Sequence, residues 1–369
     1  MSHPSDRLSR RTLLRRGALG AGAVFAGGSI LAACGGDETA GPKSSTAPAS
    51  TTAGPAGDFD AELKALGRKV RLNWGGGACE APLYAAYHQG FFEEAGVPAE
   101  LTKISGAAGR DAVSTGKADF APGILFEWLK PIEQGLDIRL TGGLHKGCLR
   151  TVAHEKSGIT SLAQLKGKEV GTDSIGGSAM AFFSIDIAKA GINPAKDIKW
   201  RVFQGDALDT ALRKREVDVI VSSDPFGYLS IDAGYGREIG SNASPEHRDQ
   251  YCCATTTNYG FLQKYPAVTA KVVQAWFRGS LWAGKNIEAT AKLENEKKYV
   301  AADRETLEKL LSSYIWEPGV DQFHEQLTQG AKDFKATGYL TADTDTTALA
   351  KKAFVDVLGQ TNTPVPTAA

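Results

Sequence analysis

The chain has 369 residues, of which 42% are hydrophobic, and it carries 42 basic and 42 acidic side chains. This length and apolar content allow a large core that divides into two lobes. The balanced charge gives no sign of a nucleic-acid-binding surface, so we expect no nucleic-acid partner.

The N-terminus has the pattern of an export signal. A twin-arginine sequence, SRRTLLR, is followed by an apolar segment rich in glycine and alanine from Gly17 to Ala33. The segment ends in LAAC, which is similar to a bacterial lipobox and predicts cleavage of residues 1–33 and lipidation of Cys34. The alternative is a membrane-spanning helix with a chance cysteine, but the run is short and glycine-rich for a span.

Residues 34–58 form the next segment and consist mainly of Gly, Ser, Thr, Ala and Pro. A segment of this composition has little to bury and is typical of a flexible linker. We therefore predict a protein exported by the twin-arginine route and held through an N-terminal lipid on the extracytoplasmic face of the bacterial cell membrane.

From about Phe59, short apolar strands alternate with helices. The first strand is expected at Val70–Trp74, and the helix after it begins near Pro82, a residue suited to a first helical turn. Alternation of this kind predicts a parallel sheet with helices on both faces and a ligand site beyond the carboxyl ends of the strands. Small-residue loops are expected to share that edge, at residues 74–80, 105–110 and 122–127.

The pattern recurs in the second half of the chain. A strand near Val170 runs into the loop Asp173–Ser178, and a helix follows to Ala190. The free N–H groups and the positive end of the helix dipole would face a ligand in that loop. A glycine-rich turn with a serine N-cap explains the same residues without a ligand. Two extended segments, 144–153 and 251–257, are placed to carry the chain between the two units.

Several segments resemble solute-binding proteins of ABC importers, in particular the nitrate, sulfonate, taurine and bicarbonate group. They are GITSLAQLKGKEVGTDSIGGSA, ALRKREVDVIVSSDPF, APLYAAYHQGFFEEAGV, GKADFAPG and YPAVTAKVVQAWFRG. The resemblance implies an α/β, two-lobed type II periplasmic-binding fold with two hinge-crossing strands and C-terminal helices packed on lobe 1. We assign residues 59–147 to lobe 1, 148–250 to the first crossing with lobe 2, and 251–369 to the second crossing with the C-terminal helices.

The resemblance also implies a function. A monomeric protein of this group captures a small solute between its lobes and delivers it to a membrane permease with its ATPase, without acting as an enzyme and without a cofactor or metal. Loop hydroxyls and N–H groups suit an anion, whereas Glu80, Glu127 and Asp224 favour a ligand with a cationic or N–H-rich part. The residues therefore do not decide the identity or the charge of the ligand. The ligand-binding residues carried over by position are Trp74, Gly76, Cys79, Glu80, Ser105, Gly106, Glu127, Ser174, Gly176, Gly177, Ser178 and Asp224.

Four cysteines lie beyond Cys34, at positions 79, 148, 252 and 253. Cys148 lies in one crossing and the Cys252-Cys253 pair in the other, so we expect one hinge disulfide. Because neighbouring residues on a strand point to opposite faces, only one of the pair should meet Cys148. Free buried thiols and a thiolate metal site that includes His145 are the alternatives.

Two other classes of function remain open. One is an enzyme on the same fold, related to thiamine-pyrimidine synthases, which carry clustered cysteines and a histidine. The other is a surface solute sensor that uses the same two lobes to signal.

Overall fold

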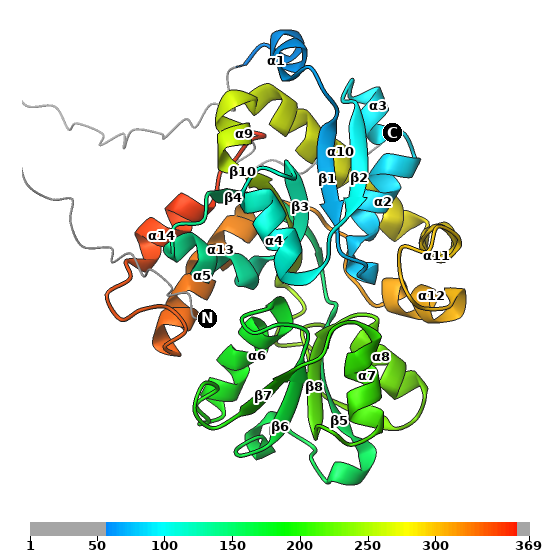
Figure 1. The fold of residues 1–369 in the computed structure, drawn as a ribbon, viewed down its shortest axis with the longest axis vertical. Helices are drawn as coiled ribbons and strands as arrows, with labels where there is room; N and C mark the ends of the chain where they lie inside the picture. The colour runs from blue at the N-terminus through cyan, green and yellow to red at the C-terminus, as the bar shows by residue number, and fades with distance from the viewer. Residues whose placement is uncertain (1–56, 360–369) are drawn as a thin grey trace, which may run out of the picture. The chain divides into compact units, whose positions relative to one another are not determined.

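The computed structural model describes residues 57–359, so the predicted signal peptide, Cys34 and most of the linker lie outside the described residues. Two sheets, each covered by helices, form two lobes (Figure 1). None of the helices in the described range is long and apolar enough to cross a membrane.

The first lobe is built on a five-stranded sheet in the order β2-β1-β3-β10-β4. β1 pairs in parallel with β2 and β3, whereas β10 runs antiparallel to both of its neighbours. The strands are β1 (Val70–Trp74), β2 (Ala99–Lys103), β3 (Phe120–Ile124), β4 (Ile138–Lys146) and β10 (Tyr251–Asn258). The helices of this part are α1 (Phe59–Leu66), η1 (Ala78–Glu80), α2 (Ala81–His88), α3 (Phe91–Glu94), α4 (Gly106–Ser114) and α5 (Leu125–Glu133).

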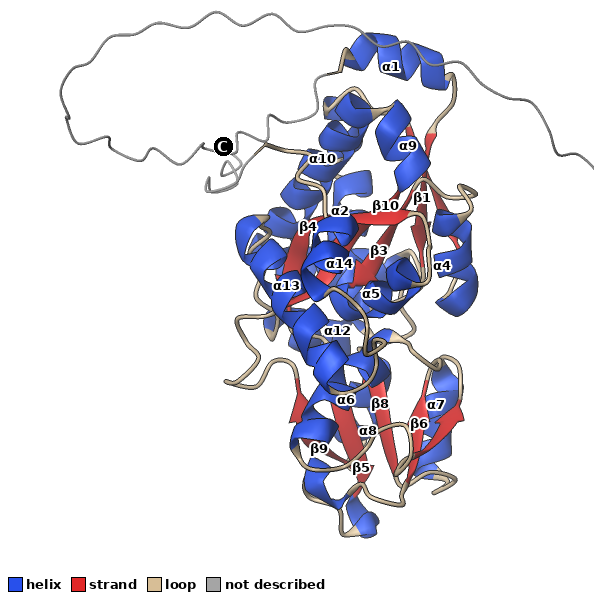
Figure 2. Cartoon of the chain, turned by 90° about the vertical axis from the view of Figure 1, so that its left-hand side faces the viewer, coloured by secondary structure: helices blue, strands red, loops and turns tan. Residues whose placement is uncertain are grey.

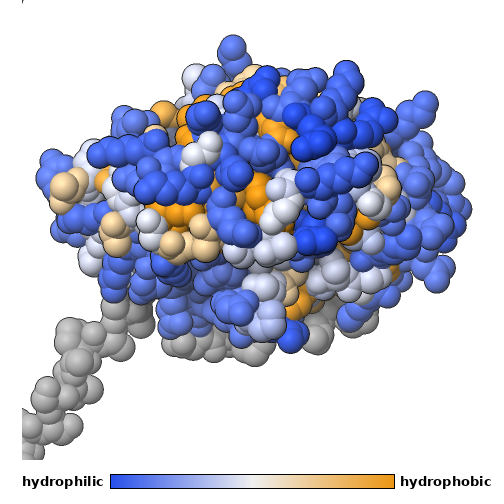
Figure 3. All heavy atoms as spheres, turned by 90° about the horizontal axis from the view of Figure 1, so that it is seen from below, coloured by the Kyte–Doolittle hydropathy of each residue, from blue (hydrophilic) through white to orange (hydrophobic). Residues whose placement is uncertain are grey.

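The second lobe repeats this plan with a sheet in the order β7-β6-β8-β5-β9. Its strands are β5 (Leu149–His154), β6 (Glu169–Thr172), β7 (Lys199–Val202), β8 (Val219–Ser223) and β9 (Gly236–Ser241). Its helices are η2 (Glu155–Ser157), η3 (Leu162–Gln164), α6 (Ser178–Lys189), α7 (Asp206–Arg213) and α8 (Phe226–Asp232). The end of the molecule that this lobe forms presents a mainly hydrophilic surface (Figure 3).

The chain passes between the two sheets at residues 147–148 and again at 242–250. The first passage is abrupt because β4 and β5 are separated only by Gly147 and Cys148, with φ angles of 84° and 115°. A positive φ is rare for a residue other than glycine, so Cys148 holds a strained backbone conformation. β4 and β5 are buried along their whole length, which places this joint in the core.

The C-terminal helices pack mainly on the first lobe, as predicted (Figure 2). α10 packs directly against α2, and Gly279 permits this close approach. A Cβ atom at position 279 would come within 2.1 Å of the Pro82 carbonyl oxygen. α12 also reaches the second lobe, where Lys309 pairs with Asp232 at 3.3 Å. These helices are α9 (Tyr259–Lys264), α10 (Pro266–Lys285), α11 (Ile287–Glu296), α12 (Arg304–Ser312), α13 (Asp321–Ala336) and α14 (Thr346–Ala353).

Candidate functional site

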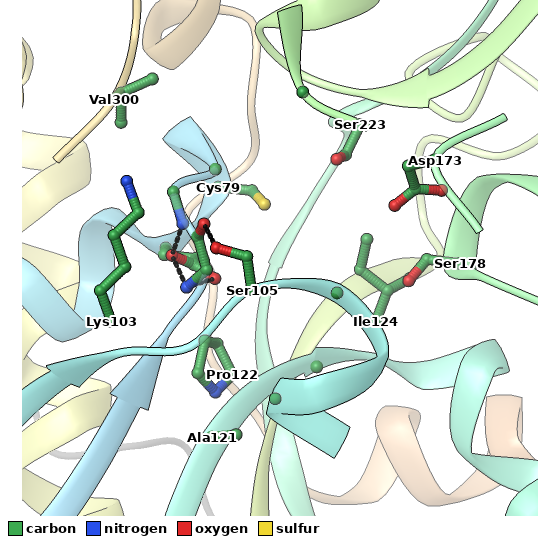
Figure 4. A pocket seen from close by; sticks show the side chains of 18 of the residues that line it. Cys79, Lys103, Ser105, Ala121, Pro122, Ile124, Asp173, Ser178, Ser223 and Val300 are labelled. Carbon is green, nitrogen blue, oxygen red and sulfur yellow. Dashed lines mark hydrogen bonds between the residues drawn. The ribbon is translucent and has the colours of Figure 1, made fainter. Parts of the chain in front are cut away.

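A cavity of about 810 Å³ lies between the lobes. Its walls come from the loops that follow β1, β2 and β3 in the first lobe and β6, β7 and β8 in the second. Figure 4 shows Asp173, Ser178 and Ser223 of the second lobe across the space from Lys103 and Ser105 of the first. The cavity therefore occupies the edge that the alternation of strands and helices predicted.

The loop after β1 is held by a carboxylate from within the same segment. Glu80 accepts hydrogen bonds from the N–H groups of Gly75 (2.9 Å) and Gly76 (3.0 Å) and from the Tyr84 hydroxyl (2.6 Å). Burial and the neighbouring Cys79 raise the pKa of Glu80 to about 7, against the effect of these hydrogen bonds. Glu80 lines the cavity, but its oxygens are already engaged in shaping the loop.

A second carboxylate, Glu127, joins the two lobes. Its Oε2 atom accepts a hydrogen bond from the Ser178 hydroxyl at 2.9 Å, and Arg110 lies 3.4 Å from the same oxygen. Burial raises the pKa of Glu127, while Arg110 and Ser178 oppose that shift. Because Ser178 begins α6 in the second lobe, this contact exists only when the lobes are close together.

The loop before α6 shows which of its groups reach the cavity. Ser174 and Ser178 line it, whereas Gly176 and Gly177 do not. Asp173 also lines it and accepts from the N–H group of Ser174 at 2.9 Å. Burial raises the pKa of Asp173, and this hydrogen bond acts against the increase. The loop therefore offers hydroxyls to a ligand rather than the backbone of its glycines.

Asp224 and Trp74, both predicted to bind ligand, lie outside the cavity lining. Asp224 is fully buried and accepts hydrogen bonds from Arg150 Nε and the Tyr314 hydroxyl, both at 2.8 Å. Burial raises the pKa of Asp224, although Arg150 opposes the effect. Trp74 packs edge-on against Tyr84, with ring centroids 5.8 Å apart. Both side chains stabilise the walls of the site.

Eight of the twelve predicted residues line the cavity: Gly76, Cys79, Glu80, Ser105, Gly106, Glu127, Ser174 and Ser178. Sequence reasoning missed Lys103, Gln204 and Ser223, although each follows or ends a strand and the rule used for the other loops could have found them. It also missed Asn295 and residues 298–302, which the C-terminal helices bring to the cavity and for which the sequence offers no comparable signal.

Two polar atoms at the cavity have no protein partner. Trp128 Nε1 and Asn73 Oδ1 form no hydrogen bond within the described residues, and both side chains are at least nine-tenths buried. Both residues belong to the cavity lining. Each of these two atoms has less than 1 Å² of accessible surface, so it lies behind the cavity wall and is not open to the cavity itself.

The cysteines form a cluster at the joint of the lobes. Cys79, Cys148, Cys252 and Cys253 are all free and buried, so the expected hinge disulfide is absent from the structure. The Cys148 sulfur lies within 4.8 Å of the sulfurs of Cys79 and Cys253, in a group that does not include Cys252. The register of β10 against β4 shifts on both sides of Cys253, and such an irregularity redirects side chains. Hydrogen bonds with Cys148 and Cys253 lower the pKa of Cys79, although burial opposes them.

Comparison with known structures confirms the class of fold. The alkanesulfonate-binding protein SsuA from Xanthomonas axonopodis pv. citri bound to MOPS matches with a TM-score of 0.63 and 16% identity, over 73% of this chain and 93% of that one. The periplasmic nitrate-binding protein NrtA from Synechocystis PCC 6803 matches with a TM-score of 0.66 and 16% identity, over 79% and 86%. The desulfurization enzyme DSZB matches with a TM-score of 0.54 and 17% identity, over 79% and 98%. The chain therefore has the two-lobed periplasmic-binding fold, as the sequence predicted.

The family follows from the sequence itself. Residues 64–295 match the model of the NMT1-like family, and the chain belongs to that family. No curated protein sequence matches it. The resemblance to nitrate- and sulfonate-binding proteins inferred from the sequence segments is thus confirmed at the level of family and fold.

Proposed function

We propose that this protein is an extracytoplasmic solute-binding protein that captures a small molecule between its lobes and delivers it to the permease of an ABC importer with its ATPase. The observation that carries the proposal is the cavity of about 810 Å³ with walls from both lobes. A ligand that contacts both walls favours the form in which the lobes are close, and that form is the one a permease would recognise.

The charges around the cavity favour a ligand with an anionic or acceptor-rich group. Glu80 is used by its own loop, and Glu127 by Ser178 and Arg110. Lys103, in contrast, forms no ion pair within residues 57–359, and its Nζ lies 4.7 Å from the centroid of the Trp74 ring. The Lys103 ammonium group is therefore free to bind an acceptor.

A hydrogen-bond acceptor faces the cavity from the second lobe, where Asp173 belongs to the lining. A small organic solute with an anionic group for Lys103 and an N–H group for Asp173 would satisfy both. An aminoalkyl sulfonate such as taurine is the simplest probe of that class, and nitrate tests whether the anionic group alone suffices.

The membrane attachment forms part of the same proposal. Cleavage before Cys34, lipidation of its sulfur and export by the twin-arginine route would hold a monomeric body near the permease. In cell fractionation the native chain should stay with membranes, and the Cys34→Ser variant should leave them. Membrane retention of that variant would contradict the lipid anchor.

A second candidate function is an enzyme, because Cys79 reaches the cavity and one protein of the same fold is a desulfurization enzyme. A solute sensor would use the same cavity, and only a genetic test of uptake separates it from a carrier. Solute capture is favoured over catalysis because the cavity lining consists mainly of hydroxyl, backbone and charged groups that bind a solute. The thiol that an enzyme would use as a nucleophile, Cys79, lies in a cluster with other cysteines.

A thermal-shift screen of the chain without residues 1–33 tests the proposal. The panel covers nitrate, bicarbonate, alkyl sulfonates, taurine, thiamine precursors and amines. A ligand at about 100 times its Kd stabilises the folded state by about 2.7 kcal/mol and raises the Tm accordingly. Lys103→Ala should abolish the shift by the true ligand, whereas Lys117→Ala, on the surface away from the cavity, should not. Absence of any shift contradicts solute capture, and chemical conversion of a compound supports the enzyme.

A further inference from the structure

The cluster at the joint of the lobes contains four groups that commonly bind metal ions. Cys79 lies in η1, His145 near the end of β4, Cys148 in the first passage between the lobes, and Cys253 in β10. One ligand atom from each lies within 4.8 Å of all the others. The four side chains are between 0% and 5% exposed.

These distances are close to those of a zinc centre. Tetrahedral Zn²⁺ has Zn–S distances of about 2.3 Å and Zn–N distances of about 2.0–2.1 Å, which separates its ligand atoms by roughly 3.5–3.8 Å. The four side chains would need to move together by no more than about an ångström, which rotation about side-chain bonds supplies. Three cysteines and one histidine are also a donor set found in structural zinc sites.

The histidine is held as a metal ligand usually is. His145 Nε2 lies 2.9 Å from the carbonyl oxygen of Cys79, and its ring stacks on Tyr314 with centroids 5.3 Å apart. The tautomer that donates from Nε2 to that carbonyl leaves a lone pair on Nδ1, which lies 3.4 Å from the Lys146 carbonyl oxygen, a contact that binding an ion would replace. Metal-bound histidines commonly donate their second ring nitrogen to a carbonyl or carboxylate, which fixes the tautomer and the ring orientation.

The backbone supports the same arrangement. Cys148 has a φ of 115°, a conformation that a side chain other than glycine rarely adopts. Gly147 before it also has a positive φ, so the chain turns sharply where it leaves β4. This turn keeps the Cys148 sulfur within 4.8 Å of the ligand atoms of Cys79, His145 and Cys253, although a glycine there would avoid the strain.

We propose that Cys79, His145, Cys148 and Cys253 bind one Zn²⁺ ion in a closed, four-coordinate site. The three thiols release their protons to solvent when the Zn–S bonds form, and no electron is transferred. The ion would tie the loop after β1 to the first passage between the lobes, through Cys148, and to β10, through Cys253. The site goes beyond solute capture, and because Cys79 and Cys253 also belong to the cavity lining, the ion would form part of the cavity wall.

Metal titration of the reduced, metal-free full-length chain tests the site. Co²⁺ should bind at one ion per chain with the intense visible absorption of a tetrahedral thiolate site, and Zn²⁺ should displace it. Cys79→Ser, Cys148→Ser and His145→Asn should each weaken Zn²⁺ binding by at least about 100-fold in competition with a chromophoric chelator. Cys252→Ser is the matched control, because it removes a buried thiol of the same cluster outside the four-ligand set; it and Cys34→Ser should change affinity less than about threefold.

A variant that fails to fold would not decide the question, so the wild-type chain provides a second measurement. X-ray absorption of the zinc-loaded protein should show three sulfurs at about 2.3 Å and one nitrogen at about 2.0–2.1 Å. Failure of the reduced chain to bind Zn²⁺, a shell of oxygen and nitrogen only, or an equal loss in Cys252→Ser overturns the proposal. So does a disulfide between Cys148 and either Cys252 or Cys253 in protein taken from its native cell envelope.

Discussion

The two glycine-rich loops that face each other across the cavity share one sequence pattern and differ in what holds them. The first-lobe loop is fixed by Glu80, whose carboxylate binds two N–H groups of the same loop and Tyr84. The second-lobe loop sends Ser178 across the cavity to Glu127. The first loop is therefore shaped before any ligand arrives, whereas part of the second loop's bonding depends on the lobes being close.

The largest effect should come from removing the carboxylate that fixes the first loop. Glu80→Ala leaves the N–H groups of Gly75 and Gly76 and the Tyr84 hydroxyl without their partner. We expect a loss of about 2–3 kcal/mol in the free energy of unfolding, measured by urea denaturation. Glu93→Ala, at an exposed position of the same lobe, should change it by less than about 0.5 kcal/mol. If Glu80→Ala matched this control, the loop would be stable without its carboxylate.

The first-lobe side carries another buried acid, Glu294 in α11, whose oxygens have no hydrogen-bond partner within the described residues. Burial, Cys79 and Glu80 raise the pKa of Glu294 well above its usual value. The native state therefore keeps a proton that the unfolded chain releases above about pH 4.3, so stability falls as pH rises toward the raised pKa.

Glu294→Gln tests this directly because it keeps the shape of the protonated acid. As pH rises above about 5, wild-type unfolding free energy should fall more steeply than that of the variant, by up to about 1.4 kcal/mol per pH unit. Glu296→Gln, an exposed acid on the same helix, should keep the wild-type slope. Equal slopes in wild type and Glu294→Gln would show that Glu294 is ionised in the native protein.

A smaller effect is expected for the second loop, and it should appear in binding rather than in folding. Ser178→Ala removes the hydrogen bond to Glu127 and with it part of what holds the lobes together. We expect ligand affinity, measured by calorimetry with whichever compound the screen identifies, to fall about tenfold, or about 1.4 kcal/mol. Ser174→Ala removes a hydroxyl of the same loop that forms no hydrogen bond to the first lobe within residues 57–359, and should cost less. An unchanged affinity for Ser178→Ala would mean that the lobes close without this bond.

The sequence could predict where these loops lie but not how they are held. Alternating strands and helices place both loops at the carboxyl edges of their sheets, since that follows from local periodicity alone. That Glu80 turns back to its own loop, and that Asp224 pairs with Arg150, depend on contacts between segments five to 74 residues apart. The approach of Cys79 to the crossing strands likewise follows from tertiary packing and from the irregular register at Cys253.

The smallest effect concerns Tyr339, which follows α13 and donates a hydrogen bond to the carbonyl oxygen of Gly176 at 3.3 Å. Burial raises the pKa of Tyr339, so its hydroxyl keeps its proton at neutral pH and can donate. Tyr339→Phe should lower ligand affinity by only about two- to fivefold, because a neutral bond of this length contributes at most about 1 kcal/mol. Tyr259→Phe in α9 leaves the second loop untouched and should bind as wild type. A loss of affinity as large as that of Ser178→Ala would mean that the C-terminal helices hold the second loop as firmly as Glu127 does. The contrast between a fixed first loop and a second loop that depends on closure of the lobes would then fail.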